Sequence, residues 1–571
     1  MSNKGKKEVI YDLKPIKAPV ASGVSLKILC ALVENGATGA LLAGNLLAQT
    51  GVKAMRAAQA DALHPLTPPL PRVEEPDLSA GPLDAECLQA LPASKAAESS
   101  FRFETSADLV QAFKEGKSTP EKVAEKILAA CRADDERDPP MRAFISQDEE
   151  DVMRQAKDAT RRYAGGISLG PLDGVPVAIK DELDQKGYGT TVGTRFLGKT
   201  PAEEDAWVVA SLRRAGAVLI GKANMHEIGL GVTGVNPHHG AARNPYDPTR
   251  ATGGSSSGPA ACVAAGLGPV AVGADGGGSI RIPAALCGLV GLKPTFGRVS
   301  ERGAAPLCWS VAHVGPIGAT ARDVALAYGL MAGIDPEDSN THMQPSVSLD
   351  EMRRPDLKKI KLGIYRPWFE DASEDIVAAC QKMLSHFEGL GAELVEVELP
   401  ELSLLRVVHM VTIVSEMAAS MSEHMKAHRK DFGLDTRMNL ALAARLSASD
   451  YIHAQRLRMR ISAHFNRAMD EVDMLLTPAT ACTAPVISAK VARTGESNLG
   501  LLEQIMRFAP AANLTGLPAI SFPAGYNSEG MPIGMQAMGR PFEEDLLLAL
   551  AGFSEGFVAR KAPKVHHRLL D

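Results

Sequence analysis

The sequence predicts an α/β domain in which helices cover both faces of a mixed central sheet, preceded by an N-terminal helical hairpin. Three observations support this fold class. Helical patterns alternate with short apolar runs of strand length through most of the 571 residues, as in layered α/β domains. Hydrophobic residues make up 45% of the chain, enough to supply a large core. Two further apolar stretches stand close together near the N-terminus.

The apolar stretches of the N-terminus, 24–33 and 37–48, are separated by Glu34, Asn35 and Gly36. Neither reaches the ~20 residues that a membrane-spanning helix needs, and the charged, turn-prone break argues against one long span. The basic start of the chain lies far from the apolar run, so a cleaved signal peptide is not expected. Residues 1–60 are therefore predicted to form a helical hairpin. It either lies in a membrane surface or packs on the domain or at a dimer interface.

The remaining chain divides into a connector and one large domain. A proline-rich run at 64–82 predicts an extended connector within residues 61–100. No strong linker follows, so residues 101–571 are predicted to form one catalytic domain. The helices expected first are 107–115, 120–132, 149–163 and 207–215. The strands expected are 175–179, 218–220, 270–273, 360–364, 393–397 and 474–477.

A helix-rich region follows at 402–471 and contains several methionines, Met410, Met417, Met421 and Met425. Such a region could line a substrate channel. Methionine also fills gaps in ordinary cores, and we prefer that interpretation here.

Two Gly/Ser clusters, 253–258 and 275–279, carry most of the functional information. Glycine lets several backbone N–H groups turn toward one point. Three glycines directly before Ser279 therefore predict an oxyanion hole built next to its own nucleophile. A flexible linker is the alternative, but apolar residues flank both clusters and favour a packed interior. The candidate oxyanion donors are the N–H groups of Gly276, Gly277, Gly278 and Ser279, with Ser256 as a supporting hydrogen-bond donor.

A serine nucleophile needs a neighbouring base, and Lys180 is the candidate. It ends the apolar run 175–179, which is predicted to be a short buried strand. Burial at a strand end disfavours the ammonium form, so this amine could accept a proton. Taken alone, a strand-end lysine more often extends to water.

Two other motifs compete for the same region. Residues 254–258 fit the nucleophile-elbow pattern G-x-S-x-G, with Ser256 as nucleophile. That motif needs a preceding strand, whereas 244–252 holds two prolines and is predicted to be a loop. Residues 193–200 fit a phosphate-binding loop and also lack the strand that should precede it. Both matches are interpreted as accidental.

Three segments together resemble the amidase signature enzymes: GVPVAIKD at 174–181, TGGSSSGPAA at 252–261 and DGGGSIRIPAALCGLVGLKPT at 275–295. The resemblance extends over roughly residues 100–560 and implies the amidase signature fold with a Ser–Ser–Lys triad. In that triad Lys180 is the base, Ser255 follows a cis peptide bond and relays the proton, and Ser279 attacks the amide carbonyl. An acyl-enzyme is then hydrolysed by water. Asp275 and Arg281 are interpreted as a structural ion pair.

Further segments resemble the plant-type fatty acid amide hydrolases, namely 17–27, the hairpin, 225–231, 447–460 and 483–487. This resemblance implies that the substrates are N-acylethanolamines and related fatty acid amides, cleaved to fatty acid and ethanolamine. It also implies a homodimer whose hairpin admits a lipid substrate from a membrane surface. The location expected is intracellular, on the cytosolic side of the endoplasmic reticulum or plasma membrane.

Other functional classes stay open. The chain could be an amidase of the same family for small polar or aryl amides, or a glutamine-hydrolysing amidotransferase A-type subunit, which would need a partner subunit. A catalytically silent membrane-binding protein is disfavoured by the intact Lys180, Ser255 and Ser279. A net charge of −6 without a long basic block disfavours nucleic acid as a partner. The eight cysteines are scattered, and no His/Cys cluster has metal spacing, so a reduced enzyme without metal or other cofactor is expected.

Overall fold

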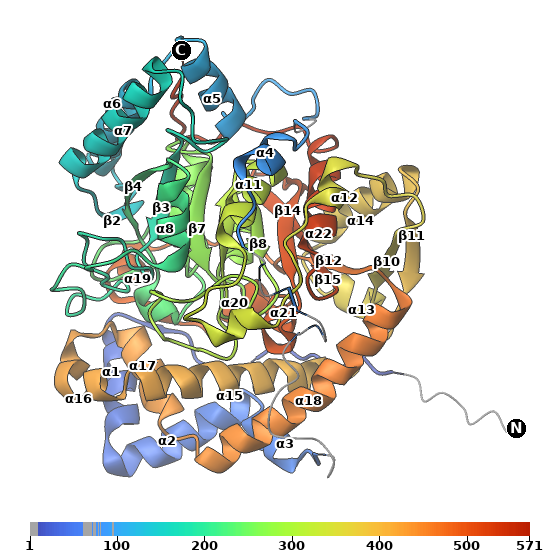
Figure 1. Cartoon of the computed structure of the whole chain (residues 1–571). Coiled ribbons are helices and arrows are strands. Elements are labelled where there is room, and N and C mark those ends of the chain that lie inside the picture. Colours follow the sequence, from blue (N-terminus) through green and yellow to red (C-terminus); the bar gives the residue numbers. More distant parts are fainter. Residues whose placement is uncertain are drawn as a thin grey trace, which may run out of the picture.

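The computed structural model describes residues 9–16, 18–60, 71, 73, 76–77, 79, 81–93 and 96–570. The largest sheet in this part of the chain has 11 strands and crosses the centre of the molecule (Figure 1). Its strand order is β11-β10-β12-β15-β14-β8-β9-β7-β3-β4-β2. In chain order these strands are β2 (Phe144–Ser146), β3 (Pro176–Lys180), β4 (Val218–Ala223), β7 (Val270–Ala274), β8 (Val290–Lys293), β9 (Val314–Gly318), β10 (Lys361–Ile364), β11 (Glu393–Glu396), β12 (Met474–Pro478), β14 (Ala519–Tyr526) and β15 (Pro532–Gly539).

The sheet is mixed, as the sequence predicts. β3 pairs in parallel with β4 and β7, and β10 pairs in parallel with β11 and β12. The other pairs are antiparallel. β3 and β7 are buried along their whole length. Their almost continuous apolar sequences, PVAIK and VAVGA, are typical of strands that are covered on both faces.

The helices surround this sheet. In chain order they are α1 (Val24–Glu34), α2 (Gly36–Gln49), α3 (Val52–Ala57), α4 (Ala85–Gln89), α5 (Ser106–Lys114), α6 (Pro120–Asp135), α7 (Glu149–Ala164), α8 (Trp207–Arg214), α9 (Ser257–Ala264), α10 (Arg281–Leu286), α11 (Ala321–Met331), α12 (Asp350–Arg353), α13 (Arg366–Phe369), α14 (Glu374–Gly389), α15 (Leu402–Ser420), α16 (Ser422–His428), α17 (Leu434–Ala443), α18 (Ala448–Glu471), α19 (Ala489–Thr494), α20 (Leu499–Met506), α21 (Pro510–Thr515) and α22 (Glu544–Glu555). The helices and strands predicted from the sequence are present, with ends that differ by at most three residues.

Helices cover both faces of the sheet, which confirms the predicted layers. Gly534 and Gly539 lie an odd number of residues apart on β15, so they face opposite sides. A Cβ on Gly534 would lie 2.5 Å from Ala285 of α10, whereas one on Gly539 would lie 3.2 Å from Leu547 of α22. α10 and α22 therefore pack on opposite faces, and their close approach explains glycine at both positions.

The N-terminal helices form a hairpin at one end of the molecule, beside α15, α17 and α18 (Figure 1). The axes of α1 and α2 meet at 109°. Leu26, Cys30 and Val33 of α1 are buried against α17. Glu34 at the end of α1 forms an ion pair with Arg437 of α17. One face of the hairpin is therefore fixed to the catalytic part of the chain.

One helix in the described ranges, α15, is long and apolar enough to cross a membrane, and α1 and α2 meet the same test only as a bent pair. α15 packs against α17, α18 and α21. Half of its most apolar window is buried within the protein. We therefore interpret α15 as a core helix.

The described parts of the predicted connector follow the surface of the domain. The backbone N–H groups of Val73 and Asp77 donate to the carbonyls of Met343 and Gln344, both at 3.3 Å. Residues 61–70 lie outside the described residues. The division into residues 1–60, 61–100 and 101–571 remains a prediction.

The prediction that residues 244–252 form a loop is wrong. β5 (Arg243–Asn244) and β6 (Asp247–Ala251) form an antiparallel hairpin in this segment. Pro245 lies in the turn between them, and Pro248 lies in β6. The other edge of β6 bonds to segment 485–487 through Thr249 and Ala251. Proline is tolerated at 248 because neither of these two bonds needs its N–H.

Candidate active site

Lys180 is the last residue of β3, and its side chain is completely enclosed. Its Nζ donates to Ser255 Oγ at 2.8 Å and to the carbonyl oxygen of Ala274 at 3.1 Å. Ala274 ends the neighbouring strand β7. β3 and β7 are parallel and in register, so the lysine and the start of the Gly/Ser loop lie at the same edge of the sheet. The predicted pairing of Lys180 with Ser255 is present.

The two Gly/Ser clusters meet at this edge. The Gly254–Ser255 peptide bond is cis, as the family resemblance implies. Ser256 links the clusters, because its N–H donates to the Ser279 carbonyl at 3.2 Å and its hydroxyl donates to the Ala274 carbonyl at 3.2 Å. Ser256 is completely buried. It therefore supports the loop, as predicted, and does not act as an exposed nucleophile, although the structure does place β6 before it and α9 after it.

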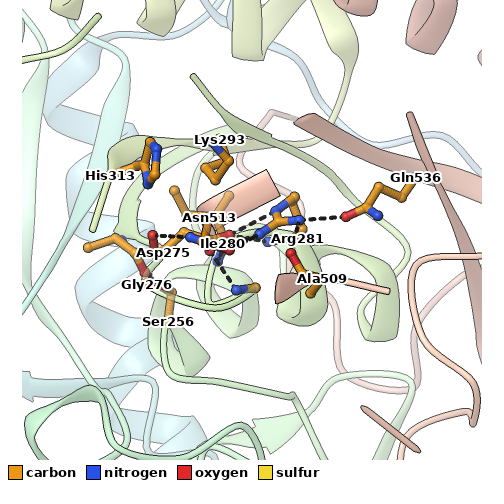
Figure 2. A network of polar contacts seen from close by, with 12 residues as sticks. Ser256, Asp275, Gly276, Ile280, Arg281, Lys293, His313, Ala509, Asn513 and Gln536 are labelled. Atoms are coloured by element: carbon orange, nitrogen blue, oxygen red, sulfur yellow. Dashed lines mark hydrogen bonds and ion pairs between the residues drawn. The ribbon is translucent and has the colours of Figure 1, made fainter. Parts of the chain in front are cut away.

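Asp275 organises the catalytic loop through a buried polar network (Figure 2). Its carboxylate accepts from Arg281 Nε at 3.0 Å and from Asn513 Nδ2 at 2.9 Å. Arg281 in turn donates to Gln536 Oε1 at 2.6 Å. All four side chains are buried. This network confirms the predicted ion pair and adds two partners, Asn513 and Gln536, from the C-terminal part of the chain.

The carboxylate of Asp275 stays ionised despite its burial. Burial alone would raise the pKa of Asp275, but the charge and hydrogen bonds of Arg281 and the hydrogen bonds of Asn513 and Gly278 outweigh it. They hold the pKa well below its usual value. The ionised side chain can therefore accept several backbone and side-chain donors at once.

The backbone N–H groups of the loop divide into two sets. The N–H of Gly278 donates to Asp275 Oδ1 at 2.6 Å, so the prediction that it serves the oxyanion is wrong. Within the described chain, the N–H groups of Gly276, Gly277 and Ser279 have no protein acceptor. These three remain the candidate oxyanion donors. Because Asp275 holds the N–H of Gly278, it also fixes the direction of the neighbouring N–H groups of Gly277 and Ser279.

Glycine is required at two positions of this loop. Gly278 has a φ of 118°, in the region that L side chains rarely adopt. A Cβ there would also lie 2.5 Å from Ile282. A Cβ on Gly277 would lie 2.8 Å from the imidazole of His409 on α15. The glycine run therefore lets α15 approach the loop closely.

His409 attaches α15 to the loop. Its Nε2 lies 2.8 Å from the carbonyl oxygen of Gly276. Burial lowers the pKa of His409 to about 4, so the imidazole is neutral at neutral pH and its Nε2–H donates to that carbonyl. The sequence reasoning missed this residue because it lies more than a hundred residues from the loop.

Ser279 lines an apolar pocket, together with Gly277, Gly231 and His409. Other apolar lining residues come from the N-terminal segment (Leu13, Ile16), α2 (Leu46, Leu47), α13 (Trp368), α15 (Leu402, Leu405, Met410, Ile413, Val414), α17 (Met438, Leu442) and α20 (Leu499, Leu502, Met506). Met410 therefore faces a cavity, contrary to the preferred interpretation. Met417 and Met421 belong to a buried core cluster, in agreement with it.

The charged groups in the pocket wall are paired with one another. Arg507 Nη2 donates to Glu503 Oε2 at 2.7 Å, and Arg406 Nη1 lies 3.6 Å from Glu503 Oε1. The pocket is consequently apolar along most of its length. It suits an acyl chain better than a small polar amide.

Glu182 is a second partner of Lys180 that the sequence reasoning missed. Its Oε2 lies 2.6 Å from Lys180 Nζ, and both side chains are buried. The strand β3 ends at Lys180, and the N–H of Leu183 donates to the Lys180 carbonyl at 3.1 Å, so Asp181 and Glu182 lie in a turn. The turn brings Glu182 to Lys180, whereas Asp181 faces Lys222 at 3.5 Å.

The arrangement contains the groups that an acyl-transfer site needs: a base, a candidate nucleophile and hydrogen-bond donors for an oxyanion. A buried amine contacts the hydroxyl of Ser255, a second hydroxyl faces a pocket, and free N–H groups surround it. In the described residues the hydroxyls of Ser255 and Ser279 are not hydrogen-bonded to each other. No group of three or more His, Cys, Asp or Glu side chains in the described residues could hold a metal ion.

This fold and site define an amidase. The amidase family profile matches residues 125–548, and the chain belongs to the amidase signature family. It is accordingly an amide C–N hydrolase. The predicted family and fold are both confirmed.

The chain is also similar to individual relatives and solved structures. It is 38% identical to the fatty acid amide hydrolase of Oryza sativa subsp. indica and 37% identical to that of Arabidopsis thaliana, in each case over 99% of this chain and 97% of the relative. It is 35% identical to the A-type subunit of the glutamyl-tRNA(Gln) amidotransferase of Thioalkalivibrio sulfidiphilus, over 78% of this chain and 96% of that relative. The peptide amidase of Stenotrophomonas maltophilia has the same fold, with a TM-score of 0.70 and 28% identity over 80% of this chain and 98% of that one.

Proposed function

We propose that this chain hydrolyses fatty acid amides, such as N-acylethanolamines, to a free fatty acid and ethanolamine. The observation that carries the proposal is the apolar pocket that Ser279 lines. Each CH₂ group moved from water into such a pocket gains about 0.8 kcal/mol. A long acyl chain would therefore bind far more tightly than a short one, with its carbonyl next to the catalytic loop.

The chemistry proposed is acyl transfer in two stages. Lys180 in its free-amine form takes the proton of Ser255, and Ser255 takes the proton of Ser279 as Ser279 Oγ attacks the carbonyl carbon. The N–H groups of Gly276, Gly277 and Ser279 stabilise the oxyanion. The proton returns through Ser255 to the leaving nitrogen, and the C–N bond breaks. Water then attacks the acyl-enzyme by the same relay and releases the fatty acid.

This relay needs Ser255 and Ser279 to become hydrogen-bonded when substrate binds. Catalytic hydrogen bonds are often long in the absence of substrate and shorten in the reactive complex. The N–H of Ser256, the residue after Ser255, donates to the Ser279 carbonyl at 3.2 Å, so the two serines already lie on neighbouring backbone segments.

We further propose that the N-terminal hairpin lies against a membrane surface. Val24, Ile28 and Leu32 recur every four residues on α1 and are 72%, 55% and 39% exposed, so they form one apolar stripe. Leu41 on α2 is 73% exposed. The hairpin also contributes Leu46 to the pocket, so one segment forms both the exposed apolar stripe and part of the pocket wall.

This arrangement would let a lipid amide pass from a membrane into the pocket. A homodimer and an intracellular membrane location, at the endoplasmic reticulum or plasma membrane, belong to the same proposal. They rest on the resemblance to the plant-type fatty acid amide hydrolases.

The proposal is tested by comparing the hydrolysis of a long-chain N-acylethanolamine with that of a short acyl amide, using the purified chain and its Ser279→Ala variant. A serine-dependent kcat/KM that strongly favours the long chain is expected. A preference for the short amide would refute the lipid substrate while leaving the triad. No hydrolysis of either amide would favour the amidotransferase function, which would then require its partner.

A further inference from the structure

The amine of Lys180 has three oxygen neighbours, and only one of them can give up a proton. Nζ lies 2.8 Å from Ser255 Oγ, 3.1 Å from the Ala274 carbonyl oxygen and 2.6 Å from Glu182 Oε2. A carbonyl and an ionised carboxylate only accept hydrogen bonds, whereas a hydroxyl both donates and accepts. The three partners are therefore not equivalent for a lysine that must act as a base.

This difference determines where the nitrogen lone pair points. A free amine has two N–H groups and one lone pair. When these hydrogens lie toward the acceptor-only oxygens of Ala274 and Glu182, the lone pair faces the hydroxyl of Ser255. That hydroxyl is the one partner with a proton to donate.

Water does not compete for these contacts. The side chains of Lys180 and Glu182 are 1% and 8% exposed, and Ser255 is buried. An ion pair is strengthened by such a low-dielectric environment and is little screened by salt.

Other titratable and charged groups surround the pair. Glu301 and Cys308 of segment 294–313 interact with it directly, and Glu416 of α15 interacts with both of them. Glu416 accepts from the Ser310 N–H at 3.1 Å and from Tyr451 Oη at 2.9 Å, and Arg458 lies near it.

Glu301 is mostly protonated at neutral pH. Burial, together with the neighbouring carboxylates of Asp338, Glu182 and Glu416, raises the pKa of Glu301 to about 8. Glu301 therefore does not compete with Glu182 for the charge of Lys180. Glu182 is the carboxylate that directly contacts the amine.

We infer that Glu182 is a positioning residue for the base, which holds the Lys180 amine against Ser255 and, through its charge, sets the acid limit of activity. The inference rests on the proposed role of Lys180. The direction of the expected effect follows from electrostatics. A carboxylate 2.6 Å from the amine favours the ammonium form, so removing its charge should favour the free amine.

The test is the pH profile of kcat/KM for Glu182→Gln. The amide retains an oxygen that can accept from the amine but loses the negative charge. The acid limb of the profile is expected to move to lower pH by about one to three units. Glu182→Leu removes the acceptor as well, and its plateau kcat is expected to fall about 10- to 100-fold with little change in KM.

Glu416→Gln is the matched control. It removes a buried carboxylate from the same region that does not contact Lys180, and its acid limb is expected to stay at the wild-type position. An unchanged limb in a folded Glu182→Gln variant would overturn the inference. An equal shift in Glu416→Gln would also overturn it, because it would mean that any nearby charge has the same effect.

Two further measurements distinguish a failure of this inference from a failure of the proposed function. If Glu182→Gln does not fold, Glu182→Asp preserves the charge at a longer distance. It should lower kcat and move the limb in the same direction as a loss of charge, but by less than about one unit, and a limb moved to higher pH would contradict the inference. Lys180→Met and the ratio of long- to short-chain rates test the proposed function itself. Retained activity in Lys180→Met would remove lysine as the base, whereas a lost chain-length preference would change only the substrate.

Discussion

At the scale of single residues, Asp275 determines the geometry of the catalytic loop. It orients the N–H of Gly278, contacts Asn513 and forms an ion pair with Arg281. All of these groups are buried. A buried ion pair adds little net stability, but removing one partner leaves an uncompensated charge, which costs about 3–5 kcal/mol.

We therefore expect Asp275→Asn to lower the free energy of unfolding by about 3–5 kcal/mol and to reduce hydrolysis of every amide. Because the pKa of Asp275 is depressed in the folded state, its contribution is complete above the ordinary carboxyl pKa of about 4. It is lost only as the pH falls through the lower folded-state value. The difference in the free energy of unfolding between the wild type and Asp275→Asn should consequently become smaller in acid.

Denaturant unfolding at pH 7 and at acid pH measures this difference. Asp431→Asn is the control, because the ion pair of Asp431 with Arg195 is exposed and such pairs contribute about 0–1 kcal/mol. An Asp275→Asn variant as stable as this control would contradict the role assigned to Asp275.

The candidate catalytic residues were also the most predictable part of the site. Lys180, Ser255 and Ser279 lie in short, specific motifs, and the motif residues do meet at one edge of the sheet. His409 and Glu182 were missed because both depend on folded geometry. His409 reaches the loop only through tertiary packing of α15, and Glu182 reaches Lys180 through a turn that the sequence pattern does not specify.

At the scale of helices and strands, α15 has two different apolar faces. Val407, Val408 and Val411 face a core cluster, whereas Met410 and Ile413 line the pocket. Sequence alone cannot distinguish these faces, because both consist of aliphatic residues at helical spacing. For the same reason, core packing and channel lining could not be separated for the methionines.

Filling the pocket from this helix should change the substrate preference. Ile413→Trp is expected to lower kcat/KM for a long-chain amide about tenfold or more, since added volume in a packed site costs about 1–3 kcal/mol. Hydrolysis of a short amide should stay near the wild-type rate. The same substitution at Ile452, which is 46% exposed on α18, should affect neither substrate. Equal loss of both activities in Ile413→Trp would argue against an acyl pocket.

The exposed stripe of α1 leads to a second prediction at this scale. Val24→Glu combined with Ile28→Glu is expected to weaken binding to phosphatidylcholine vesicles in a sedimentation assay, since charged side chains do not enter the apolar part of a bilayer. The short-amide rate should not change. Ile167→Glu, at a residue 64% exposed outside the hairpin, is the control.

Unchanged vesicle binding in the double variant would contradict the membrane proposal. A change in the sedimentation mass of the protein alone would instead indicate that the stripe is the interface of a dimer.

At the scale of the whole molecule, the pocket joins parts of the chain that are far apart in sequence. Leu13, Leu46, His409 and Leu502 approach Ser279 only in the folded chain. The layers of the fold followed from local patterns, since buried strands and amphipathic helices differ in period. The pocket could not be predicted from local patterns, because it depends on how α15, α20 and the N-terminal segment pack against one another.

The whole enzyme is also expected to work without a metal ion or another cofactor. The proposed proton relay runs from Ser279 through Ser255 to Lys180 and needs neither. Dialysis against EDTA should leave kcat unchanged for both long and short amides. A loss of activity that zinc or another divalent ion restores would contradict this mechanism.

The proposed mechanism depends on attack by Ser279 on an acyl carbonyl in an apolar pocket. The sharpest test is to treat the protein with a long-chain alkyl fluorophosphonate and a short-chain one, and to locate and time the adducts with peptide mass spectrometry. We predict a single adduct on Ser279 that forms at least about tenfold faster with the long chain, the effect of burying a few CH₂ groups. An adduct on Ser255 or Ser256, or equal rates for the two probes, would contradict this mechanism.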